Sequence, residues 1–113
     1  MQPIPKSLLI HSVMLHKIKS RERWGKEELD PGVELTGVRL EPSGRIVRDK
    51  NNAEVQLEAV LFYDCRNSRP RDVVLEVDDI VVFQGQKFSV QTAEPLYDGK
   101  RLHHYEMGLV KHA

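Results

Sequence analysis

The fold is decided by residues 78–94, which read DDIVVFQGQKFSVQTAE. Two runs rich in β-branched and aromatic residues, 80–83 and 87–92, flank the dipeptide Gln84-Gly85. Such runs on either side of a short turn that contains glycine are typical of a β-hairpin. The sequence therefore predicts two antiparallel strands joined at Gln84-Gly85.

A second turn follows within residues 97–100, where Asp98-Gly99 precedes an apolar and aromatic run at 102–109. Asp-Gly is among the most favoured hairpin dipeptides because both positions tolerate a positive φ. We therefore expect three consecutive strands to close the chain as a meander.

Further strands are predicted upstream. The mixed run 9–18 has a β-branched centre, and 33–40 alternates apolar and polar residues, with Gly37 as the expected bulge where the alternation changes face. Residues 54–64 form the clearest central strand. One face of that strand is expected to carry Val55, Leu57, Ala59, Leu61 and Tyr63.

The opposite face of the 54–64 strand changes from polar to apolar, and its last two residues are Val60 and Phe62. A strand whose outer side enters a subunit interface has this pattern, and burial under a neighbouring loop produces it too. Residues 19–31 contain many charged residues around Trp24, which predicts an exposed loop with one large apolar side chain that can bind another protein. Trp24, Val60 and Phe62 are the candidate subunit contacts.

Taken together, roughly six or seven short strands with turns at regular spacing and no amphipathic helix indicate an all-β fold. We predict a small single-domain β-barrel with long loops over residues 1–113, with a compact sandwich as the alternative. A chain of this length buries one modest core. Residues 73–77 alternate as well, and residues 65–71 form a basic loop.

The composition narrows the function classes. Lys and Arg number 17, as do Asp and Glu, so no net field attracts nucleic acid or an anionic membrane. The single cysteine, Cys65, excludes an internal disulfide and fits a reducing cytoplasm. No apolar run approaches the roughly 20 residues of a membrane span, and the N-terminus lacks a signal-peptide core. We expect a protein that stays inside a cell until it meets a partner, with no membrane contact.

The sequence gives little support for a catalytic site or a metal site. The sequence contains no nucleophile elbow and no phosphate-cradling glycine loop, so we predict that the protein is not an enzyme and needs no cofactor. His103 and His104 are adjacent on an expected strand and should point to opposite faces, so they cannot share one metal ion. We therefore predict no metal site.

Four stretches carry a resemblance to a known family: LLIHSV (8–13), RIVRD (45–49), LFYDCRNSRP (61–70) and EPLYDGKRLHHYE (94–106). They resemble the minor capsid proteins of tailed phages and prophages of Gram-positive bacteria. The hairpin at 79–90 is similar, at the level of the fold, to the head-closure (stopper) proteins of siphophage head-to-tail connectors.

This resemblance implies a structural virion protein at the head-tail junction. Its expected partners are portal or adaptor and tail proteins, and its expected state in the particle is a homo-oligomeric ring that helps to retain packaged DNA. The sequence leaves open whether the subunit is a stopper, an adaptor or a tail-completion protein, because all three are small connector parts with few chemical constraints.

In stopper proteins a long loop between strands projects into the central channel, and the best match in this chain is the polar segment 41–53. The resemblance then implies that Arg45, Arg48 and Lys50 face DNA phosphates, while Ile46 and Val47 pair strands of neighbouring subunits. The alternative is a solvated turn whose charges keep the protein soluble.

A rival function is direct binding of nucleic acid by an OB-like or SH3-like barrel. Such barrels stack bases on exposed aromatic side chains beside basic groups. Aromatic residues make up only 6% of this chain, most of them at positions where the alternation predicts core, and the net charge is zero. These features count against the rival.

Overall fold

The computed structural model describes residues 2–21 and 27–112, and in them every regular element except one turn of 3-10 helix is a strand. The elements are η1 (Lys6–Leu8), β1 (His11–His16), β2 (Ile18–Arg21), β3 (Glu27–Leu29), β4 (Val33–Pro42), β5 (Ile46–Arg48), β6 (Glu54–Gln56), β7 (Ala59–Asp64), β8 (Ile80–Phe83), β9 (Gln86–Asp98) and β10 (Arg101–Lys111). The expected all-β class is confirmed. No helix in the described residues is long and apolar enough to cross a bilayer.

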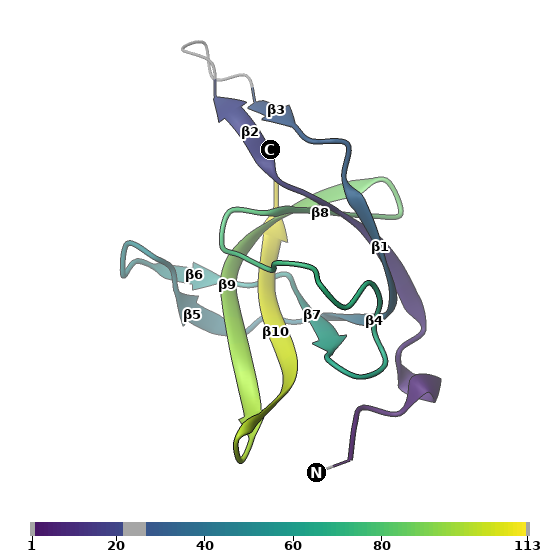
Figure 1. The fold of residues 1–113 in the computed structure, drawn as a ribbon. Coiled ribbons are helices and arrows are strands. Elements are labelled where there is room, and N and C mark those ends of the chain that lie inside the picture. Colours follow the sequence, from purple (N-terminus) through teal and green to yellow (C-terminus); the bar gives the residue numbers. More distant parts are fainter. Residues whose placement is uncertain (1, 22–26, 113) are drawn as a thin grey trace.

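Six strands form a closed barrel in the order β1-β4-β7-β10-β9-β8 (Figure 1). Every neighbouring pair is antiparallel, and β1 closes the ring because it pairs with both β4 and β8. Closure leaves the six strands without a free edge. The barrel is therefore the form that the structure takes, rather than the sandwich.

The meander at the end of the chain is present as β8, β9 and β10. Gln84 and Gly85 connect β8 to β9 with φ values of 50° and 77°, as a two-residue turn with two left-handed positions requires. The second turn lies one residue later than expected. Asp98 pairs with Arg101, so its central residues are Gly99, with a φ of 61°, and Lys100.

The barrel interior is filled by alternate residues of its strands, as period-2 alternation requires. Phe88 and Val90 of β9 face this interior together with Leu61 and Tyr63 of β7. The remaining buried members of the cluster are Val13, Leu15, Leu35, Val38, Ala59, Leu75, Val81, Met107 and Leu109. The bulge expected at Gly37 is confirmed, because β4 carries one extra residue opposite β1 between the Leu35 and Val38 pairs.

The predicted continuous strand over 54–64 is wrong: the structure divides it into β6 and β7 at Leu57 and Glu58. Leu57 does not join the interior face. Its two Cδ atoms lie 2.8 and 2.9 Å from the position that a Cβ on Gly108 would take. Gly108 alternates with the interior residues of β10, so Leu57 lies against the outer face of the barrel. The chain turns outward here because Glu58 donates its N–H to the Leu109 carbonyl at 2.8 Å.

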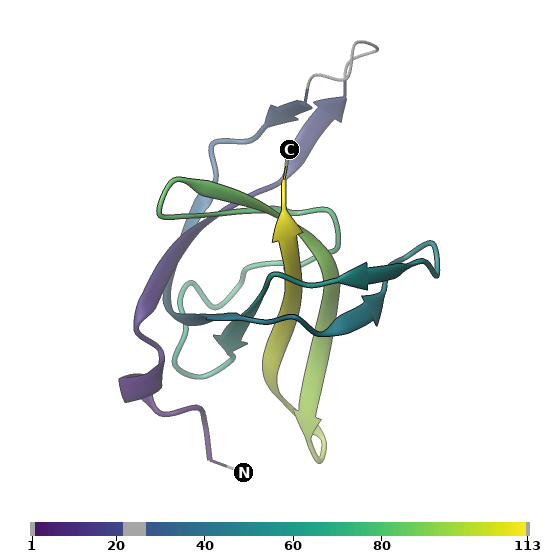
Figure 2. The same ribbon diagram turned by 180° about the vertical axis from the view of Figure 1, so that it is seen from behind.

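Two hairpins leave the barrel, and we call them the upper arm (β2 with β3) and the side arm (β5 with β6). Figures 1 and 2 show the upper arm extending past the end of the barrel at which the C-terminus lies, while the side arm leaves the wall. The sequence predicted loops over 19–31 and 41–53, and the strands in the described parts of both segments correct that prediction. Short polar strands show no alternation of apolar and polar residues in the sequence, because neither of their faces is buried.

Residues 73–77 alternate like a strand but form none. Leu75 is buried and Val73 packs against the core cluster, so the apolar residues of this loop cover the barrel without pairing in the sheet.

Candidate functional site

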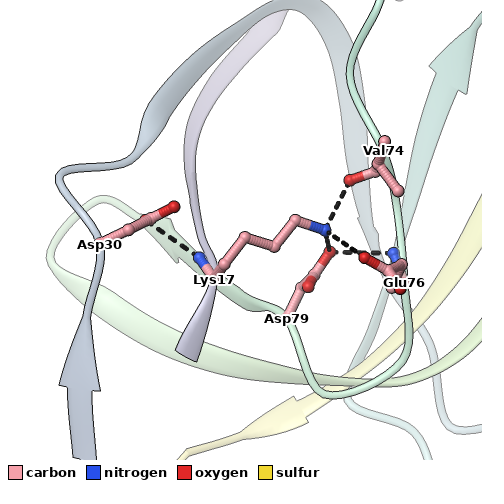
Figure 3. A network of polar contacts seen from close by, with 5 residues as sticks. All are labelled: Lys17, Asp30, Val74, Glu76 and Asp79. Atoms are coloured by element: carbon pink, nitrogen blue, oxygen red, sulfur yellow. Dashed lines mark hydrogen bonds and ion pairs between the residues drawn. The ribbon is translucent and has the colours of Figure 1, made fainter. Parts of the chain in front are cut away.

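Lys17 fixes the base of the upper arm, at the one residue between β1 and β2 (Figure 3). Its backbone N–H donates to Asp30 Oδ1 at 3.0 Å. Its Nζ donates to the Val74 carbonyl at 2.6 Å, to Glu76 Oε1 at 3.2 Å and to Asp79 Oδ2 at 2.6 Å. The backbone and side chain of Lys17 thus hold the arm, the 70–79 loop and the start of β8 in a fixed relation.

Asp79 is the buried acid of this junction, with 4% of its surface exposed. Its Oδ2 also accepts the Glu76 N–H at 2.9 Å. Burial raises the pKa of Asp79 above its ordinary value, and the hydrogen bonds from Lys17 and from the Glu76 backbone offset only part of that rise. The charge of Asp79 therefore costs the folded state free energy despite its cation partner.

We expect the contribution of Asp79 to the stability of the protein to fall as the pH rises from about 4 through the ionisation of Asp79. A carboxyl whose pKa is higher in the folded than in the unfolded state stabilises the fold when it is protonated, and that contribution is lost above its folded-state pKa. Asp79→Asn should remove this component. Thermal melts from pH 3 to pH 8 measure this component. The difference in melting temperature between the wild type and Asp79→Asn should grow with pH.

The exposed Asp72→Asn serves as the control for loss of one carboxylate in the same loop. Its difference from the wild type should change less with pH than that of Asp79→Asn. Parallel pH profiles for the wild type and Asp79→Asn would contradict the assignment of this component to Asp79.

A second tie joins the upper arm to the end of the chain. His112 Nε2 lies 2.5 Å from Glu27 Oε1, and His112 Nδ1 lies 2.6 Å from Ser89 Oγ. A serine, a histidine and a glutamate in one line resemble a hydrolase triad, but Ser89 lies within a paired strand whose neighbours are Ile80 and Val110. Its backbone N–H belongs to the sheet and cannot serve as an oxyanion donor. The contacts among Glu27, His112 and Ser89 therefore serve to join the upper arm to the end of β10.

The side arm contains the residues that were expected to face DNA. Ile46 and Val47 pair with Gln56 and Val55, so they already belong to a two-stranded sheet within the subunit. Ile46 is 62% exposed, whereas Val47 is half-buried.

The basic side chains of the side arm differ in their contacts. The guanidinium of Arg48 places Nη2 3.6 Å from Glu54 Oε1, and its Nη1 donates to the Asn52 carbonyl at 2.8 Å. Lys50 forms an ion pair with Asp78. Arg45 is exposed and forms no ion pair with a described residue. Among the described residues, therefore, Arg45 has no ion pair, Arg48 joins the two strands of the hairpin, and Lys50 joins the arm to the loop before β8.

Of the three candidate subunit contacts, Val60 and Phe62 lie within the described part of the chain and Trp24 lies outside it. Val60 is only 5% exposed in the single subunit, next to Gly108 under the cover of Leu57. Burial within the subunit thus explains the apolar pattern at Val60. Phe62 is half-exposed and stacks against the His104 ring with centroids 6.4 Å apart.

The two adjacent histidines point toward each other, contrary to expectation. A register irregularity between Leu102 and His104 breaks the alternation, and the Nδ1 atoms of His103 and His104 lie 2.8 Å apart. His103 Nε2 lies 2.6 Å from the carbonyl oxygen of Gln2, and His104 Nε2 lies 2.9 Å from Glu106 Oε2.

A carbonyl only accepts, so His103 Nε2 donates to the Gln2 carbonyl. The pair ties the N-terminal segment to β10. No group of three or more metal-ligating side chains occurs in residues 2–21 and 27–112.

The aromatic residues do not form a base-stacking platform in the described parts of the chain. Tyr63 and Phe88 are buried, Phe83 and Tyr105 pack against the core, and Tyr97 is 59% exposed. Single-strand binding modules need several exposed aromatic rings along a basic groove. The arrangement disfavours the nucleic-acid-binding rival.

Comparison with known families places these features in context. Residues 5–109 match the model of a family described as "Minor capsid protein". The chain belongs to this family. A search of curated proteins and a search of solved structures found no match. The minor capsid protein is thus a structural component of a phage virion, as its resemblance to that family predicted.

The contacts at Lys17 and His112 were missed from sequence. Lys17 lies 62 residues from Asp79, and His112 lies 85 residues from Glu27. No local pattern links such pairs. The density of charge in 19–31 predicted an exposed loop and gave no sign of these contacts.

Proposed function

We propose that this minor capsid protein is a head-tail connector subunit of the stopper type, which joins the portal to the tail and retains packaged DNA. The observation that carries the proposal is the side arm: a hairpin that leaves a closed barrel and presents an exposed isoleucine, Ile46, beside the free cation of Arg45. An exposed apolar side chain on a projecting hairpin is available for contact with a neighbouring protein.

The side arm suits contacts between copies arranged in a ring. Its sheet consists of β5 and β6 alone, so each strand keeps one edge without a partner among the described elements. An unpaired edge is a template for strand addition from a neighbouring chain. Head-to-tail contacts between unlike surfaces close into rings. In this proposal Ile46 and Val47 lie at that contact, Arg48 keeps the hairpin in shape, and Lys50 holds the arm against the loop before β8.

DNA contact in this proposal falls mainly to Arg45, with Arg48 and Lys50 adding to the positive field of the ring. Phosphate contacts of this kind read no sequence, and many copies in a ring multiply a weak individual contact. The zero net charge of the chain fits a protein that touches DNA at one narrow place.

The outer face of the barrel offers the second contact that a ring subunit needs. Phe62 is half-exposed, with His104 stacked on it and Glu106 directly opposite it in the register. An aromatic side chain within a polar border is typical of the centre of a protein interface. We assign this face, with Trp24, to contacts with a neighbouring subunit or with the portal or adaptor.

Deleting the gene in a phage that encodes the protein tests this role. We expect heads that package DNA and then lose it, together with tails that remain unattached, because a stopper closes the portal and forms the surface on which the tail docks. Electron microscopy of lysates counts full heads, empty heads and free tails. Full, stable heads without tails would indicate a tail-completion protein, and tailed particles that infect normally would overturn the proposal.

A further inference from the structure

A pocket of about 480 Å³ is lined by residues of the N-terminal segment, of the loop after β7 and of the β9–β10 hairpin end. Three arginines contribute to its lining: Arg66 and Arg71 from the loop after β7, and Arg101 from the start of β10. Pro3 and Leu102 supply apolar wall. The side arm takes no part in it.

Ion pairs divide the basic side chains of the described residues into two groups. Lys17, Lys19, Arg39, Arg48, Lys50 and Lys111 each form an ion pair with a carboxylate. Arg66, Arg71 and Arg101 form none with any described residue. In a protein with balanced charge, three guanidinium groups around one hollow that holds two carboxylates are a local excess.

The other polar groups of the pocket do not cancel this excess. Asp64 is fully buried, and its carboxylate accepts backbone N–H groups from Ile4 at 3.0 Å, Arg66 at 3.1 Å and Asn67 at 2.8 Å. Burial, followed by the nearby charge of Asp64, raises the pKa of Cys65 from 9.0, so the thiol is neutral at physiological pH.

Charge counting gives the size of the excess. Asp64 and Asp98 are the two carboxylates of the lining, and three arginines against two carboxylates leave one positive charge. That charge is concentrated in guanidinium groups that lie at the exposed surface, whereas the Asp64 carboxylate is buried.

The wall of the pocket is held in place. Besides its bond to Asp64, Ile4 accepts a hydrogen bond on its carbonyl from Asn67 Nδ2 at 2.8 Å, and the Gln2 carbonyl accepts one from His103 at 2.6 Å. These contacts fix the N-terminal segment on both sides of Pro3. A ligand therefore meets a preformed site and pays little for ordering it.

We infer that this arginine pocket binds carboxylate side chains of an acidic peptide segment from another protein of the particle. The guanidinium fork matches a carboxylate with two parallel hydrogen bonds. Tyr97 is exposed and directly opposite Leu102 in the register, so it flanks the pocket on the same face. Tyrosine and arginine are enriched at the residues that dominate protein interfaces.

A protein ligand fits this pocket better than DNA does. A single excess charge neutralises few phosphates, whereas DNA-binding surfaces commonly contact six or more. The lining residues include one aromatic ring, that of His103, which already contacts the Gln2 carbonyl and His104, whereas base-stacking grooves need several exposed aromatic rings. The inference rests on the proposed function in one respect, since it takes the partner to be another virion protein. It places the docking of that partner at the end of the barrel, away from the side arm.

The test is a titration of the purified, isotope-labelled protein with a synthetic peptide of alternating glutamate and glycine, followed by NMR. We expect amide signals of residues 66, 71, 97, 101 and 102 to shift. The double variant Arg71→Gln/Arg101→Gln should bind the peptide at least tenfold more weakly. Lys87→Gln removes an exposed lysine elsewhere and should leave the affinity unchanged.

Two further probes, inorganic phosphate and a duplex of about 20 base pairs, identify the ligand class. Shifts at the pocket with the duplex at lower concentration than with the peptide would overturn the inference in favour of nucleic acid. Absence of peptide shifts at these residues in the wild type would overturn it outright, even if the double variant fails to fold. The titration uses the isolated subunit, so its outcome is independent of DNA retention by particles.

Discussion

Replacing Phe88 with alanine is expected to lower the free energy of unfolding by about 3–4 kcal/mol, a large share of the stability of a domain this size. Phe88 is 8% exposed and belongs to the core cluster with Leu61, at the barrel mouth where Leu40 and Ala59 also line a hollow. Truncation enlarges that hollow and removes ring contacts. Thermal unfolding should show a melting temperature lower by more than about 10 °C.

Phe62→Ala is the matched control, because it removes the same ring from the outer face of β7. Phe62 is half-exposed, and its ring contact is the stack with His104. We expect a loss of about 1 kcal/mol or less. If Phe62 lies at a subunit contact, the same variant should impair particle assembly while the subunit stays folded. Equal destabilisation by the two variants would show that the interior and exterior faces of the sheet are assigned wrongly.

The part of the fold that is predictable from sequence is the part governed by local chemistry. Gln84-Gly85 specifies a turn with two left-handed residues, and Gly37 accommodates an extra residue in β4. The alternation of Phe88 and Val90 with polar residues fixes which face of β9 is buried. These features depend on a few neighbouring residues, so each can be recognised without knowledge of the rest of the chain.

The features that escaped prediction depend on partners remote in sequence. Leu57 continues the alternation of β7, yet it lies outside the barrel because Gly108 leaves room for it there. His103 and His104 share a side because β10 is irregular opposite β9. Strand propensity is similar for both faces of a sheet, and only tertiary packing decides between them.

The candidate site was partly predictable for the same reason. The segment 41–53 was recognised as an excursion from the barrel, and Arg45 and Ile46 are exposed as a projecting segment requires. The pairing of Ile46 with Gln56 across the arm was not foreseen. The arm is consequently an ordered hairpin in the single subunit, and its proposed role does not need a transition from disorder.

Replacing Ile46 by threonine together with Arg45 by glutamine is expected to yield heads that package DNA and then leak it. Ile46 is 62% exposed and Arg45 is unpaired among the described residues, so the stability of the subunit should change by no more than about 0.5 kcal/mol. Threonine keeps the β-branch that suits a strand, while it removes the apolar contact to a neighbouring copy. Ile46 is preferred over Val47 because Ile46 is exposed, whereas Val47 is half-buried.

The measurement is the fraction of full heads in purified particles over several days, from sedimentation and from the ratio of nucleic acid to protein absorbance. Ile46→Val serves as the conservative control and should retain DNA, because it preserves an apolar side chain at the proposed contact. Arg45→Gln alone separates the charge effect from the packing effect. In a ring of many copies a small loss per contact multiplies, so we expect most heads of the double variant to be empty. Full DNA retention and normal infectivity of the double variant would remove the gating role from the arm and leave it a solvated hairpin.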